Sequence, residues 1–535
     1  MSTNKLMQNK CFLYATGFFS GMSVMAIELG ASRMLAPYFS SSQIVWTVII
    51  GAIMVALALG NVWGGKMADK NPDPAKLYHR LLFAAIWVAL IPFLGKYIIT
   101  GISLGVGMIT TKNFLVWASL ATCLVIFVFP LMLLGTVTPC LVKYTTQDLE
   151  DNASVVGKLS ALNTIGCIIG TFLPTFVTIP AVGTAATFLI FAGILAGLSI
   201  VYFVATKKFV VKGALCVGII IAMSIVTAEH SFAFWESNIV YEDESIYNYL
   251  QVKEDEHSII LSTNVLAGVQ SIKMKNEKLT GMYYDYALAA PFMAGLHEKA
   301  GDVLILGLGT GTFATMCDEY FPNARVEGVE IDQKIADLAT EYFDLPDTVD
   351  VIVYDGRAYL QNAKKYDVIM IDAYQDITIP FQMSTVEFFT QVKEHLNEDG
   401  VMVVNLNMTS AQDGSINQYL CQTIASVFPE VYTVNVGSGT NTELFAFDNP
   451  ETLKKFEAAY LAYDEEHQVA ELTKMMTSIN ENMVKVEKGE HILTDDKAPV
   501  EVLGMRVLDE MIQGELDYLK EMLKSGNLMD IVNGI

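Results

Sequence analysis

The sequence predicts a bundle of membrane-spanning α-helices joined to an α/β domain of the Rossmann-like type. Two observations lead to this prediction. Apolar runs that reach or approach the roughly 20 residues needed to cross a bilayer recur throughout residues 1–230. Short apolar strands alternate with helical stretches in residues 303–405, which is the pattern of a parallel sheet covered by helices. A composition of 52% hydrophobic and 17% charged residues excludes a disordered chain and a small disulfide-rich domain.

Charge divides the chain at the same place. Residues 1–230 contain 14 Lys+Arg and 7 Asp+Glu, a net charge of +7. Residues 231–535 contain the other 20 Lys+Arg and 51 Asp+Glu, a net charge of −31. A domain with this much negative charge repels phosphate backbones, so no nucleic-acid partner is expected. The same charge would attract a polycationic ligand, but it is equally consistent with an ordinary solvated surface.

Seven apolar segments are expected to cross the bilayer, and a weaker run at residues 95–111 makes an eighth if it inserts. Gly and Pro inside such segments are ordinary in packed membrane helices. The seven segments are residues 11–29, 44–62, 81–99, 114–134, 159–179, 184–204 and 209–226.

Basic residues indicate the orientation. Four Lys or Arg side chains fall in residues 66–80 and three in residues 207–212, so both connections and the N-terminus are assigned to the cytoplasm. Seven crossings from there place the acidic half outside the cell, and eight place it inside. The absence of Lys and Arg between Lys212 and Lys253 favours the outside. Long hydrophilic domains can override such a local bias, so both orientations stay open.

A glycine turn begins the nucleotide-binding pattern of the acidic half. An apolar run of strand length at residues 303–307 leads into the turn, and a helical stretch and a second strand ending at Glu330 follow. The glycines of the turn are Gly307, Gly309 and Gly311. Glycine lets the backbone approach a ligand closely, and Glu330 can accept hydrogen bonds from both ribose hydroxyls. A glycine turn alone is also consistent with simple packing.

Three carboxylates come at the ends of successive strands, which strengthens the prediction of a ligand site. They are Glu330 after residues 326–329, Asp355 after the strand at 349–353, and Asp372 after the strand at 366–371. A further strand at 401–404 ends at Asn405. Ligands bind at this edge of open α/β sheets. Single acids such as Asp332 can instead be helix N-caps, but three in register favour a nucleotide-type ligand.

The spacing of the turn indicates which nucleotide. The third glycine follows the second after one residue, so the run is not the G-x-G-x-x-G of dinucleotide enzymes, and no G-x-x-x-x-G-K-[ST] occurs. The pattern resembles the S-adenosylmethionine-binding fold of methyltransferases. That resemblance implies that the turn packs on the amino-acid end of the ligand, that Glu330 holds the ribose, and that Asp355 with Gly356 lies at the adenine.

Further characteristic segments lie in both halves of the chain. The acidic half carries them at residues 244–248, 252–262, Gln270, 283–285, Pro291, 366–372 and 388–389. The N-terminal half and the tail carry others at residues 28–37, 134–139, 163–166 and 494–499. Together these segments resemble the spermidine/spermine synthase family, the polyamine aminopropyltransferases, in its membrane-fused branch. The resemblance therefore extends over nearly the whole chain and adds a small β domain before the α/β domain.

This resemblance implies transfer of an aminopropyl group from decarboxylated S-adenosylmethionine to a diamine such as putrescine, with release of methylthioadenosine. Asp372 would accept the proton of the attacking amine, and the hydroxyl of Tyr283 would hold that amine. Asn248 would lie near the sulfur of the nucleoside. The acceptor would be bound by Gln270, Asp285, Tyr374 and Asp376. The adenosyl compound is a cosubstrate, so no tightly bound cofactor is expected, and no metal is expected because the His and Cys residues form no ligand cluster.

Three positions depart from the family pattern. Thr310 stands where the family has an Asp that binds the aminopropyl amine, Asp376 comes four residues after Asp372 rather than three, and Asn248 replaces a Gln. Loss of a carboxylate that pairs with an ammonium removes a hydrogen bond worth roughly 1.5–3 kcal/mol. Two alternatives therefore remain: another small-molecule methyltransferase using S-adenosylmethionine, and a transporter or sensor that binds polyamine or nucleoside without turnover.

Four parts of the chain follow from these patterns. They are a multi-pass membrane domain at residues 1–230, a small β part at 231–295, a nucleoside-binding catalytic domain at 296–450 and a helical extension at 451–535. Amphipathic helices at 469–482 and 507–523 are expected to pack on the sheet or on a second copy of the chain. A cosubstrate made in the cytosol favours a cytoplasmic catalytic domain, against the charge pattern of a seven-span chain.

Overall fold

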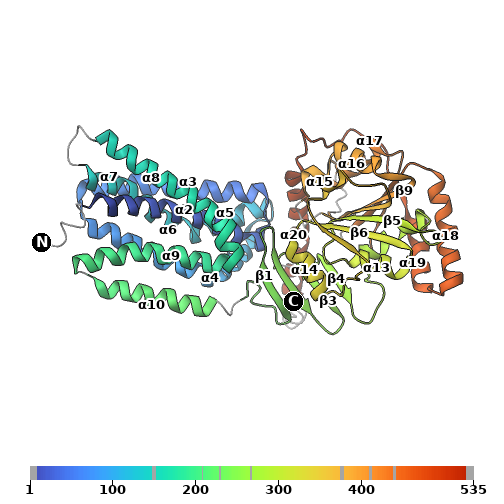
Figure 1. Ribbon diagram of the computed structural model, residues 1–535, viewed down its shortest axis with the longest axis horizontal. Helices are drawn as coiled ribbons and strands as arrows, with labels where there is room; N and C mark the ends of the chain where they lie inside the picture. Colours follow the sequence, from blue (N-terminus) through green and yellow to red (C-terminus); the bar gives the residue numbers. More distant parts are fainter. Residues whose placement is uncertain are drawn as a thin grey trace. The chain divides into compact units, whose positions relative to one another are not determined.

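The computed structural model describes residues 9–146, 152–207, 209–227, 231–265, 268–373, 379–408, 413–437 and 441–525. The chain divides into two compact units, Met1–Glu236 and Ser237–Ile535 (Figure 1). Tyr374 and Asp376, two of the predicted acceptor-binding residues, lie outside the described residues.

The first unit is helical. Several of its helices begin with a polar cap, as where Oγ of Ser42 accepts a hydrogen bond from the backbone N–H of Val45 and Oδ1 of Asp73 accepts one from Ala75. Its elements are α2 (Lys10–Phe39), α3 (Gln43–Lys70), α4 (Pro74–Ile109), α5 (Phe114–Ile126), α6 (Val128–Gly135), α7 (Val137–Thr145), α8 (Asn152–Leu173), the π-helical η1 (Pro174–Thr178), α9 (Ile179–Thr206) and α10 (Val210–Thr227).

Within the described part of the chain, six helical segments are long and apolar enough to cross a membrane. They are Lys10–Phe39, Gln43–Lys70, Pro74–Ile109, Val128–Thr145, Ala153–Thr206 and Val210–Thr227, and Phe114–Ile126 is a shorter apolar helix. The segment Ala153–Thr206 contains two of the predicted spans and is interrupted at Gly183, where φ is 78°. The weak run at 95–111 largely continues α4 without a break. The count of seven or eight crossings stays a prediction.

Helices α2 and α8 pack closely because two glycines of α8 face α2. A Cβ on Gly166 would lie 2.0 Å from the carbonyl oxygen of Phe18, and one on Gly170 would lie 2.1 Å from that of Met22. The two glycines are four residues apart and so share one face of the helix. Small residues at this spacing allow two helix backbones to approach each other in a membrane bundle.

The second unit contains a four-stranded antiparallel sheet in the order β1-β2-β3-β4. Its strands are β1 (Ile239–Glu244), β2 (Tyr249–Glu254), β3 (Ser258–Ser262) and β4 (Ser271–Met274). Leu250, Val252 and Leu261 form a small apolar cluster with Ile335 and Leu338 of helix α14 (Gln333–Glu341). This sheet lies within residues 231–295, where the separate β domain stays a prediction.

An eight-stranded sheet forms the centre of the second unit, in the order β12-β10-β11-β9-β8-β5-β6-β7. Strands β5 to β9 run parallel, and β11, β10 and β12 extend the sheet in antiparallel fashion. The bounds are β5 (Gly301–Leu306), β6 (Ala324–Glu330), β7 (Asp350–Val353), β8 (Tyr366–Ile371), β9 (Leu396–Leu406), β10 (Glu430–Asn435), β11 (Thr442–Phe447) and β12 (Val484–Lys485).

Helices cover both faces of this sheet because alternate strand residues point to opposite sides. Val303 and Ile305 belong to one core with α11, α12, α13, α18 and α19, whereas Leu304 and Leu306 belong to another with α15, α16, α17 and α20 (Figure 1). The bounds of these helices are α11 (Tyr283–Ala287), α12 (Ala289–Met293), α13 (Thr312–Tyr320), α15 (Gly356–Leu360), α16 (Val386–Glu394), α17 (Ile416–Val427), α18 (Glu451–His467), α19 (Ala470–Asn482) and α20 (Val500–Ser525), with a 3₁₀ turn η2 (Phe381–Met383). The predicted Rossmann-like, methyltransferase-type architecture of this unit is confirmed.

Candidate active site

Asp372 lies directly after β8, at the carboxyl edge of the parallel strands. Every residue of β8 is buried, and the backbone N–H of Asp372 donates to the carbonyl of Leu306, which fixes the end of the strand against β5. Oδ2 of Asp372 accepts a hydrogen bond from the hydroxyl of Tyr283 at 2.8 Å, and Oδ1 accepts one from Nδ2 of Asn405 at 3.2 Å. The residue is 9% exposed. Two neutral donors thus hold one buried carboxylate in place.

Burial raises the pKa of this carboxylate into the range of a general base that works near neutral pH. Desolvation raises the pKa of Asp372 to about 7, against the opposing hydrogen bonds from Tyr283 and Asn405, and the nearby charge of Glu330 raises it further. Burial and the facing Asp372 also hold the pKa of Tyr283 well above its usual value. Tyr283 therefore stays a hydroxyl and acts as a donor to Asp372, and the pair is suited to accepting one proton.

Glu330 ends β6 and is bound by the backbone of two turns. Its Oε2 accepts a hydrogen bond from the N–H of Gly309 at 2.9 Å, and its Oε1 accepts one from the N–H of Asp332 at 3.0 Å. Desolvation raises the pKa of Glu330 to about 7, although these backbone hydrogen bonds act to lower it. The carboxylate therefore lies against the glycine turn, where the resemblance puts the ribose.

The glycine turn requires glycine for reasons of space. Gly307 has a φ of 91°, and a Cβ there would lie 2.6 Å from the carbonyl oxygen of Asp372. Gly309 has a φ of 57°, and its Cβ would lie 2.6 Å from Oγ of Ser271 on β4. Gly311 also has a positive φ, of 83°. The turn is thus packed between the small sheet and the end of β8.

Asp355 caps helix α15. Its Oδ1 accepts a hydrogen bond of 2.8 Å from the N–H of Ala358, and Gly356 is the first residue of the helix. The side chain is only half-buried, one strand beyond Glu330. Asp355 therefore combines a capping contact with a place at the edge where the resemblance puts the adenine.

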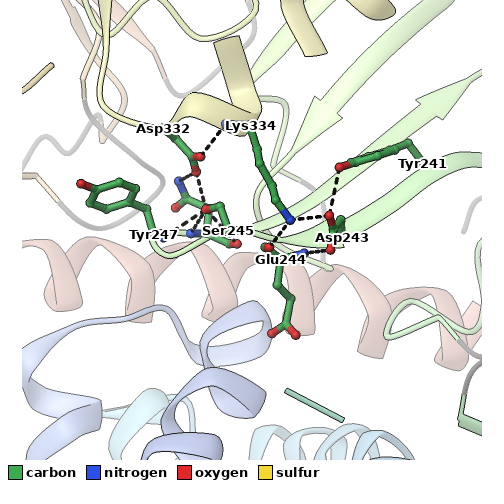
Figure 2. Close-up of polar contacts among 8 residues, drawn as sticks. Tyr241, Asp243, Glu244, Ser245, Tyr247, Asp332 and Lys334 are labelled. Atoms are coloured by element: carbon green, nitrogen blue, oxygen red, sulfur yellow. Dashed lines mark hydrogen bonds and ion pairs between the residues drawn. The ribbon is translucent and has the colours of Figure 1, made fainter. Parts of the chain in front are cut away.

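The turn between β1 and β2 is tied to the turn after β6 (Figure 2). Oδ2 of Asp332 accepts hydrogen bonds from the hydroxyl of Ser245 and from Nδ2 of Asn248, the latter at 3.1 Å. Nζ of Lys334 binds Asp243 and the carbonyl of Glu244. Asp332 also caps α14 through the N–H of Lys334. This network bonds Asn248 to Asp332, the second residue after Glu330, so Asp332 both caps α14 and holds the β1–β2 turn.

Two predicted acceptor-binding residues make contacts elsewhere. The carboxylate of Asp285 accepts hydrogen bonds from the N–H and the hydroxyl of Thr280 and from the N–H of Gly281, at 2.6–2.8 Å. Asp285 therefore closes the turn before α11. Gln270 contributes its carbonyl oxygen to the hydroxyl of Tyr284 at 2.8 Å. The structure thus gives Asp285 a place in this turn and Gln270 a backbone contact, and their predicted roles at the acceptor stay predictions.

Sequence reasoning missed two side chains at this edge. Asn405 was noted only as the end of a strand, yet it binds Asp372 directly. Glu443 on β11 is fully buried, and its pKa is raised well above the usual value by burial and by the charge of Asp372. The available signal was an acid directly before the apolar run Leu444–Phe447. Thr310, which the sequence had already marked as a departure from the family pattern, is buried, and its hydroxyl has no hydrogen-bond partner among the described residues.

Comparisons with known proteins identify the family. A profile described as the spermine/spermidine synthase domain matches residues 287–441, which include Asp372 and Asn405. A probable polyamine aminopropyl transferase of Bifidobacterium longum is 49% identical over 343 residues, covering 61% of this chain and 75% of that protein. The chain belongs to the polyamine aminopropyltransferase family. A polyamine aminopropyltransferase of Vibrio vulnificus is 30% identical over 215 residues, covering 38% of this transferase and 70% of that protein.

Membership confirms the resemblance found in the sequence and makes the protein a transferase. A more distant relative is named as a methyltransferase. An eEF1A lysine and N-terminal methyltransferase of Xenopus laevis is 30% identical over 179 residues, covering 31% of this chain and 25% of that protein. Within the described ranges, no three His, Cys, Asp or Glu side chains gather as metal ligands would.

Proposed function

We propose that the protein transfers an aminopropyl group from decarboxylated S-adenosylmethionine to a diamine such as putrescine, with Asp372 as the proton acceptor. The observation that carries this proposal is the buried Asp372 carboxylate, held by Tyr283 and Asn405 beside the glycine turn. A methyl or aminopropyl donor on such a sheet lies over that turn, so the reacting carbon falls next to Asp372.

The donor binds at the carboxyl ends of β5, β6 and β7. Glu330 accepts hydrogen bonds from the ribose hydroxyls, and Asp355 with Gly356 contacts the adenine. Gly307, Gly309 and Gly311 allow the sulfonium end to approach the backbone. Asn248 faces the same region from the β1–β2 turn, where its bond to Asp332 holds it. The acids also offset the positive charge of the sulfonium.

The reaction is a displacement at the carbon attached to sulfur. An alkylammonium with a pKa of about 10.4 is protonated at neutral pH and has no free electron pair. Asp372 takes the proton, and the amine nitrogen then attacks the methylene carbon next to the sulfonium. The carbon–sulfur bond breaks, its electrons stay on sulfur, and methylthioadenosine leaves. Tyr283 keeps Asp372 in position, and its oxygen can accept an N–H of the amine.

Thr310 supports a second candidate, a methyltransferase that uses S-adenosylmethionine itself. The residue has a hydroxyl where the family has a carboxylate for the aminopropyl ammonium. This replacement weakens selection for the decarboxylated donor, and the similarity to a named methyltransferase leads in the same direction. Asp372 would serve equally as the base for an amine that receives a methyl group.

Product analysis separates the two candidates. The purified full chain is incubated with putrescine and either decarboxylated or ordinary S-adenosylmethionine. Methylthioadenosine and spermidine from the decarboxylated donor support aminopropyl transfer. S-adenosylhomocysteine from the ordinary donor supports methylation. The absence of both products, with several diamines, would contradict both enzyme proposals and leave binding without turnover.

The first unit is proposed to anchor the enzyme in the membrane through seven or eight spans. Its helices have the length and hydropathy for this role. We place the catalytic unit in the cytoplasm because its cosubstrate is made there, which an eight-span chain satisfies. A reporter fused to the C-terminus, active on only one side of the membrane, tests this orientation. A signal from outside would favour seven spans and contradict a cytosolic supply of the donor.

A further inference from the structure

Glu443 is a buried acid that the reaction above does not use. It is the second residue of β11 and pairs with Asn405 of β9. Its exposed fraction is 0%, and neither carboxylate oxygen has a hydrogen-bond partner among the residues that the structure describes. The residues after it on the strand are Leu444, Phe445 and Ala446, all fully buried. The strand itself therefore has no visible need of an acid.

An unpaired carboxylate is one of the least favourable groups to bury, and an apolar residue of similar size would remove that cost. A buried acid of this kind can still be useful if a bound ligand supplies the opposite charge. Functional sites often carry such a cost in stability. The ligand that fits a lone buried carboxylate is a cation with N–H donors.

The position of Glu443 in the sheet indicates which cation. Asp372 follows Ile371, which pairs with Val404, and the next residue of β9, Asn405, pairs with Glu443. The three side chains therefore come from three adjacent strands, with Asn405 in the middle, bonded to Asp372 and accepting a hydrogen bond from Asn441. Two strand spacings place the backbones of Asp372 and Glu443 about 10 Å apart.

The row runs away from the donor. The glycine turn, Glu330 and Asp355 follow β5, β6 and β7, on one side of β8, whereas Glu443 lies on β11, beyond β9 on the other side. Asp372 at the end of β8 therefore lies between a group bound at Glu443 and the proposed nucleoside site.

We propose that Glu443 binds the second, unreacted ammonium of the acceptor and so makes the enzyme select diamines over monoamines. This inference rests on the proposed function. Asp372 takes a proton from the attacking nitrogen, while Glu443 neutralises the nitrogen at the far end and sets the length of the chain between them. Two acids at opposite ends of one acceptor match a substrate with two positive charges.

The test compares two acceptors of equal length on the full chain, putrescine with two amines and butylamine with one. Glu443→Gln keeps the size of the side chain and removes its charge. We expect the ratio of kcat/KM for putrescine to that for butylamine to fall about tenfold to hundredfold, with an unchanged KM for the decarboxylated donor. Glu457→Gln, an exposed acid on α18, is the matched control and should leave the ratio as it is.

Each outcome decides a separate point. If the unmodified chain transfers no aminopropyl group to any amine, the proposed function fails. If it is active and Glu443→Gln keeps the same ratio, this inference alone fails. A raised KM for the donor with an unchanged acceptor ratio would place Glu443 at the donor's own ammonium and would also overturn the inference.

Thermal unfolding without ligand distinguishes a binding role from a structural one. Because the carboxyl group has no hydrogen-bond partner in the described part of the chain, Glu443→Gln and Glu443→Leu should both unfold at a temperature equal to or above that of the unmodified chain at pH 8. Loss of folding or a lower unfolding temperature in both variants would contradict the inference, since the fold itself would then need the acid.

Discussion

The hydroxyl of Tyr283 on α11 donates a 2.8 Å hydrogen bond to Oδ2 of Asp372 at the end of β8, across 89 residues of chain. Both partners are buried, so the bond forms in a region of low dielectric constant, where its geometry is well defined. It leaves the second oxygen of Asp372 to Asn405. The carboxylate is thereby aimed before any substrate arrives.

Asp372→Asn should abolish turnover while sparing the binding of nucleoside. The amide keeps the size of the side chain but cannot accept the proton of the ammonium, and loss of a general base typically lowers the rate by about 10²–10⁴-fold. Release of methylthioadenosine measures turnover, and calorimetry with methylthioadenosine measures binding. A normal rate in this variant would remove Asp372 as the base.

The pH dependence should report the raised pKa of Asp372. Because its pKa is about 7, the group is protonated and inactive below that pH, so kcat/KM for the acceptor should rise as pH passes through about 7. Tyr283→Phe removes a hydrogen bond that lowers this pKa, so its midpoint should move to higher pH. Asp372 and Glu330 interact, so the midpoint belongs to the pair. A flat profile around pH 7, or a midpoint moved to lower pH, would argue against this assignment.

Glu330→Gln should weaken the binding of the nucleoside more than the binding of the amine acceptor. A hydrogen bond to a charged group is worth about 1.5–3 kcal/mol, which corresponds to a tenfold to hundredfold rise in the Kd of methylthioadenosine. Glu341→Gln, at the exposed end of α14, is the control. An unchanged Kd in Glu330→Gln would show that the ribose is held elsewhere.

Gly166→Ala should destabilise the helical unit. A Cβ at this place would lie 2.0 Å from a backbone oxygen of α2, so the helices must separate at a cost of about 1–3 kcal/mol. Gly193→Ala on α9 is the matched control, because its Cβ meets nothing within 4 Å, and it should be neutral or stabilising. Thermal unfolding in detergent compares the two. Equal unfolding temperatures would show that α2 and α8 pack otherwise.

Strand-length apolar runs with an acid at the end were enough to predict the parallel part of the sheet and three of its edge residues. The run before Asp372 became β8, whose residues are all buried, and the run before Glu330 became β6, which is buried at its last three residues. The tail helix predicted at 469–482 lies at Ala470–Asn482 for the same reason of periodicity. The long segment Ala153–Thr206 was predicted as two spans, and Gly183 interrupts it between them.

The contacts between distant strands could not be predicted in this way. Glu443 reaches the site only because β11 enters the sheet antiparallel beside β9, a pairing that spacing along the chain does not encode. Asp285 matched the family by position, yet the carboxylate lies in the turn at Thr280, since a short helix start satisfies it locally. Side-chain direction in short turns depends on neighbours that the sequence pattern does not identify.

Gly307 lies between the proposed donor site and the proposed base, Asp372. A Cβ at this position would lie 2.6 Å from the carbonyl oxygen of Asp372, so the proposed donor surface lies directly against the backbone of the proposed proton acceptor. A methyl group at Gly307 would displace the backbone of Asp372 and would also intrude on the proposed donor surface. Evolution or engineering of a new donor preference in this enzyme must therefore proceed through neighbouring positions such as Thr310, because the first glycine has no room to change.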